Sequence, residues 1–377
     1  MTVRTVSLKG YVIDKVVMEG DQAPNGSTIT EVSGRMYGSL KGFDVNDSGK
    51  VVYVAKLTED GEGIFTNDGE TIALSGSAAP VGGTFSNFYS PAGNRFVSIN
   101  NNDQIAFFGI LDNELEGIFT RTETIALEGW IAPNDEAYER FEGSDINDNG
   151  LIAFKARAGS NYFFTPDAIL LEDNSAPGGG VVSLIGAQIV LRNDGSGVYL
   201  GTFTDAAITG QGIFSTNGIN YGRGGDTAPG GGFFATGSAQ FNYPDANNTG
   251  EVAFLGTLDS GDEGIFTSQE RIILDGDPAP GGGTFSDLFG SPGINDDGVV
   301  VFTGIKDNGV TGVFNSNGET LVAKGDNTTN GLLITDVADP VITDAGQVVF
   351  YAAATDGVTS SEGLFSVAYG IVPVPNE

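Results

Sequence analysis

The sequence contains no cysteine and no histidine in 377 residues. Without histidine there can be no imidazole base, no histidine-based catalytic triad and no zinc or iron site with histidine ligands. Without cysteine there can be no thiol nucleophile, disulfide bond or thiolate metal site. Carboxylates, lysine, tyrosine and hydroxyl groups are therefore the side chains left for any chemistry.

Basic residues are also scarce. Lys and Arg total 17 against 49 Asp and Glu, which gives a formal net charge of −32. A surface of this sign repels phosphate backbones and anionic lipid headgroups, so binding to nucleic acid or to a membrane surface through charge is disfavoured. Cationic partners or bound cations are favoured instead.

Long apolar runs are absent, although apolar residues are not. No run approaches the roughly 20 residues that span a bilayer, and the residues from Met1 to Arg4 do not begin a recognisable signal peptide. Hydrophobic residues make up 40% of the chain and include 25 Phe, so a large core is available. We expect a folded chain without membrane insertion.

A repeat with a period near 50 runs through the sequence. One unit contains an Asn-x-x-Gly turn, an apolar run, a Gly-Ile-Phe element and a short β-branched segment. Its aromatic marker occurs seven times, at spacings of 45 to 54 residues: Phe65, Phe119, Phe164, Phe214, Phe266, Phe314 and Phe365. Because these aromatics recur in every unit, we interpret them as core residues and not as parts of a cofactor site.

Each unit is predicted to form four short antiparallel strands. In Asn295–Gly298 the Asn comes first and the Gly fourth, as a type I turn prefers, and the continuous apolar run 299–302 suits a strand buried on both faces. Seven such units favour an all-β, seven-bladed β-propeller, because closing the ring removes exposed strand edges.

The two ends of the chain predict how the ring closes. The seven units cover about residues 25–368 of a single domain, 1–377, and the last unit stops after its third strand. Residues 15–24 match the fourth strand and exit loop of another unit, 272–280, so 13–24 is predicted to be the closing segment. We therefore expect the N-terminal strand to complete the last blade, and residues 369–377 to form a C-terminal tail.

The repeat resembles a bacterial tandem-repeat family in which Asn-x-x-Gly is followed by Ala-Phe. The best matches are Asn147–Gly150 with Ala153-Phe154 and Asn247–Gly250 with Ala253-Phe254; Asp103 and Thr343 depart from the pattern. Members of that family carry alternative C-terminal anchors, in the manner of choice-of-anchor and PEP-CTERM-like exported proteins. Similarity to TolB-type β-propellers is more distant.

The resemblance implies an exported, extracellular or cell-surface protein, and it implies no known reaction. The stretch Ile371–Pro375 looks like the Pro-containing segment before a sorting signal. The leading hypothesis is therefore a non-enzymatic binding or structural module with a protein or polysaccharide partner. The alternatives are a carboxylate-dependent polysaccharide hydrolase or lyase that uses the central channel, and a subunit of a self-assembling matrix or filament.

Two kinds of loop are candidate calcium sites. Asp145–Gly150 matches the first half of an EF-hand loop, but Ala156 stands where the bidentate Glu is required. The loops between blades repeat a Gly-Asp pair, which makes four aspartates candidate metal ligands: Asp21, Asp226, Asp277 and Asp326. The alternative is that each Asp accepts backbone N–H bonds in a Gly-rich turn.

Departures from the repeat give the candidate partner site. Trp130, the only Trp, stands where four other units have Asp, and Arg157 with Tyr162 replaces an acidic loop in the third unit. A Trp and an Arg on neighbouring loops of one face suit a sugar or protein contact. The alternative places Trp130 in the packing between blades.

Overall fold

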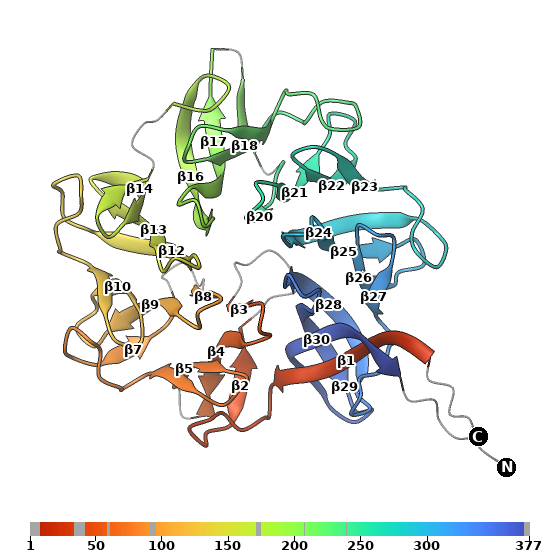
Figure 1. The fold of residues 1–377 in the computed structure, drawn as a ribbon, viewed down its shortest axis with the longest axis horizontal. Coiled ribbons are helices and arrows are strands. Elements are labelled where there is room, and N and C mark those ends of the chain that lie inside the picture. The colour runs from red at the N-terminus through yellow and green to blue at the C-terminus, as the bar shows by residue number, and fades with distance from the viewer. Residues whose placement is uncertain are drawn as a thin grey trace.

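The chain forms a ring of seven β-sheets. The computed structural model describes residues 8–33, 42–58, 61–89, 96–170, 175–206, 208–238 and 240–372. Within these ranges there are 30 strands and no α-helix. All strand pairs are antiparallel, and the sheets stand as blades around a central axis (Figure 1). The prediction of an all-β, seven-bladed propeller is confirmed.

Each blade runs from an inner strand at the axis to an outer strand at the rim. In blades 1 and 2 the inner edge consists of two strand segments. Blade 1 contains β2 (Ile29–Val32), β3 (Phe43–Val45), β4 (Val51–Leu57), β5 (Glu62–Thr66) and β6 (Thr71–Leu74). Blade 2 contains β7 (Phe85–Asn87), β8 (Val97–Ile99), β9 (Ile105–Leu111), β10 (Glu116–Phe119) and β11 (Thr124–Leu127).

The remaining blades have four strands each. Blade 3 contains β12 (Arg140–Ile146), β13 (Ile152–Ala158), β14 (Ser160–Thr165) and β15 (Ala168–Ile169). Blade 4 contains β16 (Val181–Leu191), β17 (Gly197–Thr204), β18 (Thr209–Ser215) and β19 (Asn220–Arg223). Blade 5 contains β20 (Asp245–Ala246), β21 (Val252–Thr257), β22 (Glu263–Thr267) and β23 (Arg271–Leu274). Blade 6 contains β24 (Phe285–Ile294), β25 (Val300–Lys306), β26 (Thr311–Asn315) and β27 (Thr320–Ala323). Blade 7 contains β28 (Leu333–Ile342), β29 (Val348–Thr355), β30 (Ser360–Val372) and β1 (Leu8–Met18).

Blade 7 closes the ring by joining the two ends of the chain. β1, red in Figure 1, is its outer strand and pairs with β30, blue, from Leu8 opposite Val372 to Met18 opposite Gly363. The predicted latch over 13–24 is therefore found, but its strand begins at Leu8 and ends at Met18. β30 continues through Val372, so residues 369–372 of the predicted tail belong to this strand; 373–377 lie outside the described residues.

The Gly-Ile-Phe elements build the core of each blade. All seven marker phenylalanines have 0% of their surface exposed. The Gly two residues before the Phe makes room for its ring: a Cβ placed on Gly264 would lie 2.8 Å from the ring of Phe266 and 2.5 Å from Leu274. This close packing accounts for the Gly found there in six of the seven units; blade 3 has Tyr162 at this place.

Apolar clusters lie between neighbouring blades. In one cluster Val349 and Tyr351 of blade 7 pack with Phe43 and Phe65 of blade 1. In another, Phe350 of blade 7 packs with Val301 of blade 6. Because strands β4 and β29 are buried on both faces, each sheet contributes side chains to two such clusters, as the continuous apolar runs predicted.

The Asn-x-x-Gly turns join inner strands to the next strand at one end of the channel. In blade 3, Oδ1 of Asn147 accepts hydrogen bonds from the amides of Asn149 (3.1 Å) and Leu151 (3.0 Å). Gly150 has φ +77°, the left-handed conformation that Gly adopts without strain. Asp103, which replaces this Gly in blade 2, has φ 60°. Asn capping of this kind is found in each of the five turns that begin with Asn.

Candidate functional site

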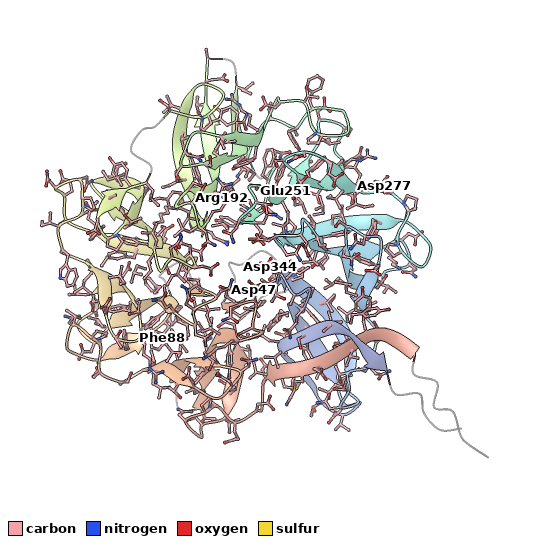
Figure 2. The ribbon with its side chains drawn as sticks, viewed as in Figure 1. Asp47, Phe88, Arg192, Glu251, Asp277 and Asp344 are labelled. Atoms are coloured by element: carbon pink, nitrogen blue, oxygen red, sulfur yellow. The ribbon has the colours of Figure 1, made fainter. Side chains whose placement is uncertain are left out.

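The seven turns form a closed ring of hydrogen bonds around the axis. The second residue of each turn donates its backbone N–H to the side-chain oxygen of the second residue in the next blade, at 2.7 to 3.0 Å. We call these seven residues the turn ring: Asp47, Asn101, Asp148, Asn193, Asn248, Asp296 and Asp344. Figure 2 shows Asp344 and Asp47, which close the ring between blades 7 and 1, near the centre.

First-position Asn residues add a second set of bonds between blades. The Nδ2 of Asn147 donates to the carbonyl of Arg192 in blade 4 at 2.9 Å, and Asn100 does the same to Asn147 at 2.8 Å. Arg192 and Thr343 occupy the same turn position in blades 4 and 7. No side-chain bond to the next blade is found for either of them in the described part of the chain. The turn ring, by contrast, is complete.

A small cavity lies on the axis next to the turn ring. It has a volume of about 110 Å³ and includes Asp44, Asp145 and Asp245 in its wall, together with Ser98, Ser144 and Gln188. The three aspartates come from inner strands of blades 1, 3 and 5, at equivalent places three residues before the turn ring. We call this the axial cavity.

Each axial aspartate accepts a backbone N–H from the following blade. Asp44 accepts from Ile99 at 2.9 Å, Asp145 from Leu191 at 2.7 Å and Asp245 from Ile294 at 3.0 Å. These carboxylates therefore help to hold neighbouring inner strands together, in addition to giving the cavity its acidic character.

Asp145 is the most perturbed of the three aspartates. Burial of its carboxylate raises its pKa to about 8, and the negative charges of Asp44 and Asp245 act in the same direction. The amide bonds from Leu191 and Ile146 oppose the rise. The residue is half-buried and lines the axial cavity.

The axial aspartates were missed in the sequence interpretation, which considered Asp145 only as the start of an EF-hand-like turn. A usable signal was present, because Phe43-Asp44-Val45 places an acid between two core residues of a short strand. Alternation in a strand sends such an acid away from the core. What the sequence does not show is that this direction is the channel axis.

The four predicted metal ligands lie in separate loops near the rim. Asp21, Asp277 and Asp326 each accept the amide N–H three residues before them, at 2.9, 2.9 and 2.8 Å, and Asp226 accepts from Asn220 Nδ2 at 2.7 Å. Asp21 also pairs with Lys15 at 2.6 Å. Figure 2 shows Asp277 at the outer edge.

The structure does not bring these four aspartates together. Across the described ranges, no three carboxylates lie close enough together to share one metal ion directly. The amide bonds fit the predicted turn role. Calcium binding at these loops stays a prediction.

Trp130 and Arg157 lie at the same end of blade 3. Trp130 is in the loop between β11 and β12 and is 43% exposed, and the neighbouring Ile131 is 68% exposed. The Trp130 carbonyl accepts the amide of Tyr138, whose ring is buried in the blade. Arg157 pairs with Glu139 at 2.9 Å and also has an exposed side chain. The loop from Trp130 to Glu139 therefore connects the two residues.

Tyr162 lies nearer the boundary with blade 4. It is partly buried, its ring meets that of Phe164 edge-on at 5.6 Å, and it lines a small hollow with the exposed Leu184 of blade 4. All three predicted partner residues are thus on blade 3, with Trp130 and Arg157 exposed to solvent and Tyr162 partly packed. Their contact with a partner stays a prediction.

The fold and its axial carboxylates define the class: a seven-bladed β-propeller with a narrow acidic channel. The chain belongs to the family of unknown function DUF7453, whose model matches residues 6–176, 70–271 and 260–372. No protein of curated function matches the chain. The predicted link to an exported tandem-repeat family stays an interpretation of the repeat.

Solved structures with similar architecture come from diverse proteins. The polysaccharide lyase Uly1 is 11% identical, with 97% of this chain and 100% of that chain covered and a TM-score of 0.39. The gluconolactonase XC5397 from Xanthomonas campestris is 8% identical, with 98% and 99% covered and a TM-score of 0.34. A subtype N11 neuraminidase-like protein of A/flat-faced bat/Peru/033/2010 is 13% identical, with 74% and 88% covered and a TM-score of 0.36. Likeness at this level assigns no activity to the chain.

Proposed function

We propose that the protein is a non-enzymatic binding or structural module outside the cell, and that it contacts its partner through Trp130, Ile131 and Arg157. We call these three residues the blade 3 patch. The observation that carries the proposal is the exposure of the only Trp beside a more exposed Ile. Large exposed apolar side chains next to an Arg have the composition of binding hot spots.

The environment of Arg157 supports the same role. Its ion pair with Glu139 fixes the guanidinium beside the loop that carries Trp130, while the side chain stays 57% exposed. An Arg held in this way loses little further freedom when it meets a partner. The loop that carries Trp130 also contains the exposed Asp135 and Glu136, so Arg157 lies among acidic side chains. A protein or polysaccharide partner fits this combination.

The size of the axial cavity favours a module over the enzyme alternative. Three carboxylates and a raised pKa are what a carboxylate-dependent hydrolase or lyase requires. However, the cavity measures about 110 Å³, whereas pockets for organic ligands measure roughly 300–1,000 Å³. Its aspartates also accept amides from neighbouring blades. We take the small size of the cavity, together with these amide bonds, as support for the module over the enzyme.

Binding assays with defined probes test the proposal. Polysaccharides of acidic, neutral and basic type and intact bacterial cells are offered to the protein, and Trp130 emission and co-sedimentation report binding. We expect Trp130→Ala and Arg157→Ala to weaken binding by about tenfold or more, the scale of an interface anchor. Ile219→Ala is the control, because Ile219 is also exposed but lies in a turn at the opposite end of its blade.

Three outcomes separate the alternatives. Binding that is unaffected by both patch variants contradicts the proposed patch. Release of products from any polysaccharide, lost in Asp145→Asn, overturns the non-enzymatic role. Concentration-dependent association in light scattering, lost in Trp130→Ala, identifies a second copy of the chain as the partner.

A further inference from the structure

A groove lies between blades 2 and 3, at the end of the ring that carries the turn ring and opposite to the blade 3 patch. Its volume is about 540 Å³, within the range of roughly 300–1,000 Å³ that is typical of ligand sites. Its walls include the turns after the inner strands of blades 2 and 3 and the turns between the third and fourth strands of blades 1, 2 and 3. We call it the interblade groove, and we call the turn between the third and fourth strands of a blade its outer turn.

Two departures from the repeat lie at this groove. In blades 1, 4, 5 and 6 the first residue of the outer turn donates its amide, at 2.8 to 3.0 Å, to the carbonyl of the residue that begins the second strand. The donors and acceptors are Asn67 and Val51, Thr216 and Gly197, Ser268 and Val252, and Ser316 and Val300. Pro166 has this place in blade 3 and has no N–H, and Arg121 has it in blade 2, where the described residues show no such bond. Both of these outer turns line the groove.

The floor of the interblade groove is apolar. Ile146 and Ile152 of blade 3 are 6% and 5% exposed and belong to the core cluster between blades 2 and 3, and Ile125 of blade 2 packs against that cluster. Ile105 and Leu151 are also part of the lining. An aliphatic chain that covers these side chains is removed from water, which is favourable.

Acidic side chains surround this floor. The lining contains four carboxylates, Glu70, Asp103, Glu123 and Asp167, and one basic residue, Arg121. The guanidinium of Arg121 lies 3.6 Å from Glu70, and Lys50 lies 3.0 Å from Glu70 and 3.7 Å from Asp103. Glu123 and Asp167 are exposed and have no ion pair within the described part of the chain. The groove therefore keeps two uncompensated carboxylates, one from blade 2 and one from blade 3.

An apolar floor between separated carboxylates favours a linear aliphatic polyamine. Its ammonium groups suit the carboxylates, and the methylene segments between them suit the floor. A basic peptide suits the groove less well, because its backbone amides would need hydrogen-bond partners above a floor of isoleucine side chains. A metal ion gains nothing from an apolar floor, and no three carboxylates in the described ranges lie close enough together to share one.

We propose that the interblade groove binds a linear polyamine. Glu123 and Asp167 accept hydrogen bonds from different ammonium groups of the ligand, and Ile125 and Leu151 pack against the methylene chain between them. The site lies at the opposite end of the ring from the blade 3 patch, so it goes beyond the proposed function and does not depend on it.

Titration of the full chain with spermidine, followed by isothermal calorimetry, tests the site. A concentration of about 0.15 M NaCl weakens diffuse binding of amines to the acidic surface. We expect one saturable site. Glu123→Gln and Asp167→Asn should each weaken binding by about tenfold, the scale of one lost hydrogen bond to a charged group.

Glu270→Gln is the matched control. Glu270 has the same place in the outer turn of blade 5 that Glu123 has in blade 2: the amides of Glu123 and Glu270 donate to the hydroxyls of Thr120 and Thr267, both at 3.1 Å. Both carboxylates are exposed, so each substitution removes the same charge without disturbing the core. Glu270→Gln should leave the affinity for spermidine unchanged, and both variants should keep the melting temperature of the wild type.

Two diamines of equal charge test the part of the floor. We expect 1,8-diaminooctane to bind about tenfold or more tightly than 1,3-diaminopropane, because its additional methylene groups cover the apolar side chains. Mg²⁺ carries the same charge without a chain, so at an equal concentration it should not displace the longer diamine.

Equal affinity for spermidine in Glu123→Gln and Glu270→Gln, or the absence of any saturable site, overturns the proposal. Equal binding of the two diamines, or displacement by Mg²⁺, shows that charge alone attracts the amines and overturns the part of the floor. Tighter binding of trilysine than of spermidine makes a basic peptide the occupant instead. Trp130→Ala should leave the affinity for spermidine unchanged, so a failure of this site and a failure of the blade 3 patch are distinguishable.

Discussion

Trp130 is a surface residue whose backbone carbonyl accepts a hydrogen bond from the amide of Tyr138. We expect red-shifted emission that acrylamide quenches, since 43% of the residue is exposed. Trp130→Ala should cost no more than about 1 kcal/mol of stability, whereas Phe119→Ala, at a fully buried position, should cost about 3–5 kcal/mol. Chemical denaturation measures both. Blue emission without quenching would place the indole in the core.

At Gly264 there is no room for the Cβ atom that any other residue would add. An added Cβ would lie 2.5 Å from Leu274 Cδ2 and 2.9 Å from the carbonyl of Ile273. We expect Gly264→Ala to lower the free energy of unfolding by about 1–3 kcal/mol, the range for overpacking. Gly61→Ala is the control, because its Cβ would approach nothing closer than 3.9 Å. A loss of equal size in both variants would contradict the packing explanation.

Glu116 gives stability a dependence on pH. Its Oε2 accepts the amide of Phe141 at 2.8 Å, and burial raises the pKa of the carboxyl above its usual range. The folded state therefore holds the proton of Glu116 more tightly than the unfolded chain does. Protonated Glu116 contributes its full stabilisation below the usual pKa of Glu, and this contribution is lost as the pH rises through the pKa of the folded state. The charged form is therefore the destabilised one.

Glu116→Gln should remove this penalty and keep the hydrogen bond. Blade 4 already uses Gln here, since Gln211 Oε1 accepts the amides of Gln240 (2.8 Å) and Phe241 (3.3 Å). The melting temperature of the variant, relative to wild type, should rise as the pH increases from the usual Glu pKa through the raised pKa of the folded state. Glu123→Gln, at an exposed position, should show no such trend. A constant difference across this range would show that Glu116 titrates normally.

At the scale of elements, β1 is the part of the chain on which closure depends. Its side chains Ile13 and Val17 are 6% and 5% exposed, and it pairs with β30 along its whole length. Deletion of residues 1–18 should lower the free energy of unfolding by several kcal/mol, because it exposes the edge of β30 and an apolar face of blade 7. Thermal unfolding measures the loss.

A synthetic peptide supplies the control for this truncation. Residues 8–18 added in trans should restore stability in proportion to their concentration. A peptide of the same composition with Ile13 and Val17 moved to neighbouring positions should not, since a shift of one residue sends these side chains to the other face. An unchanged melting temperature in the truncated chain would contradict the latch.

The blades were predictable from sequence because their signals are local and repeated. The core Phe164 has a counterpart in all seven units, and a turn that resembles Asn147–Gly150 follows the inner strand of each, so the strand order follows from a short stretch of chain. The latch was predictable because residues 15–24 match the fourth strand and exit loop of another unit. Its first residues, from Leu8, were missed because they lack the turn motif that marks the match.

The contacts along the axis were not predictable in this way. The bond from Asp344 to Asp47 joins residues 297 positions apart, and the axial cavity exists only when blades 1, 3 and 5 meet. Each aspartate alone looks like a turn or surface residue. The sequence also did not predict whether Trp130 is exposed or buried. A departure from a repeat shows that a position differs from its counterparts, but it does not show which way the side chain points.

At the scale of the whole molecule, the repulsion between acidic groups is the contribution to stability that salt concentration changes most easily. With a net charge of −32, mutual repulsion opposes the compact state. The melting temperature should therefore rise by several degrees between about 0.05 and about 0.5 M NaCl, as the screening length shortens from more than 10 Å to a few ångströms. NaCl and KCl should act alike in calorimetry. A flat response would mean that the acidic groups are already neutralised.

The turn ring has a consequence for how the blades find their order. Every member offers one amide and one side-chain oxygen, and three are Asn while four are Asp, so any blade could dock beside any other through these bonds. The ring therefore fastens neighbours without distinguishing them. Recognition of the correct neighbour falls to the apolar clusters between blades, where Phe43 and Tyr351 meet at one junction and Val301 and Phe350 at another. The hydrogen bonds of the turn ring are alike at all seven junctions, whereas the apolar side chains differ from one junction to the next.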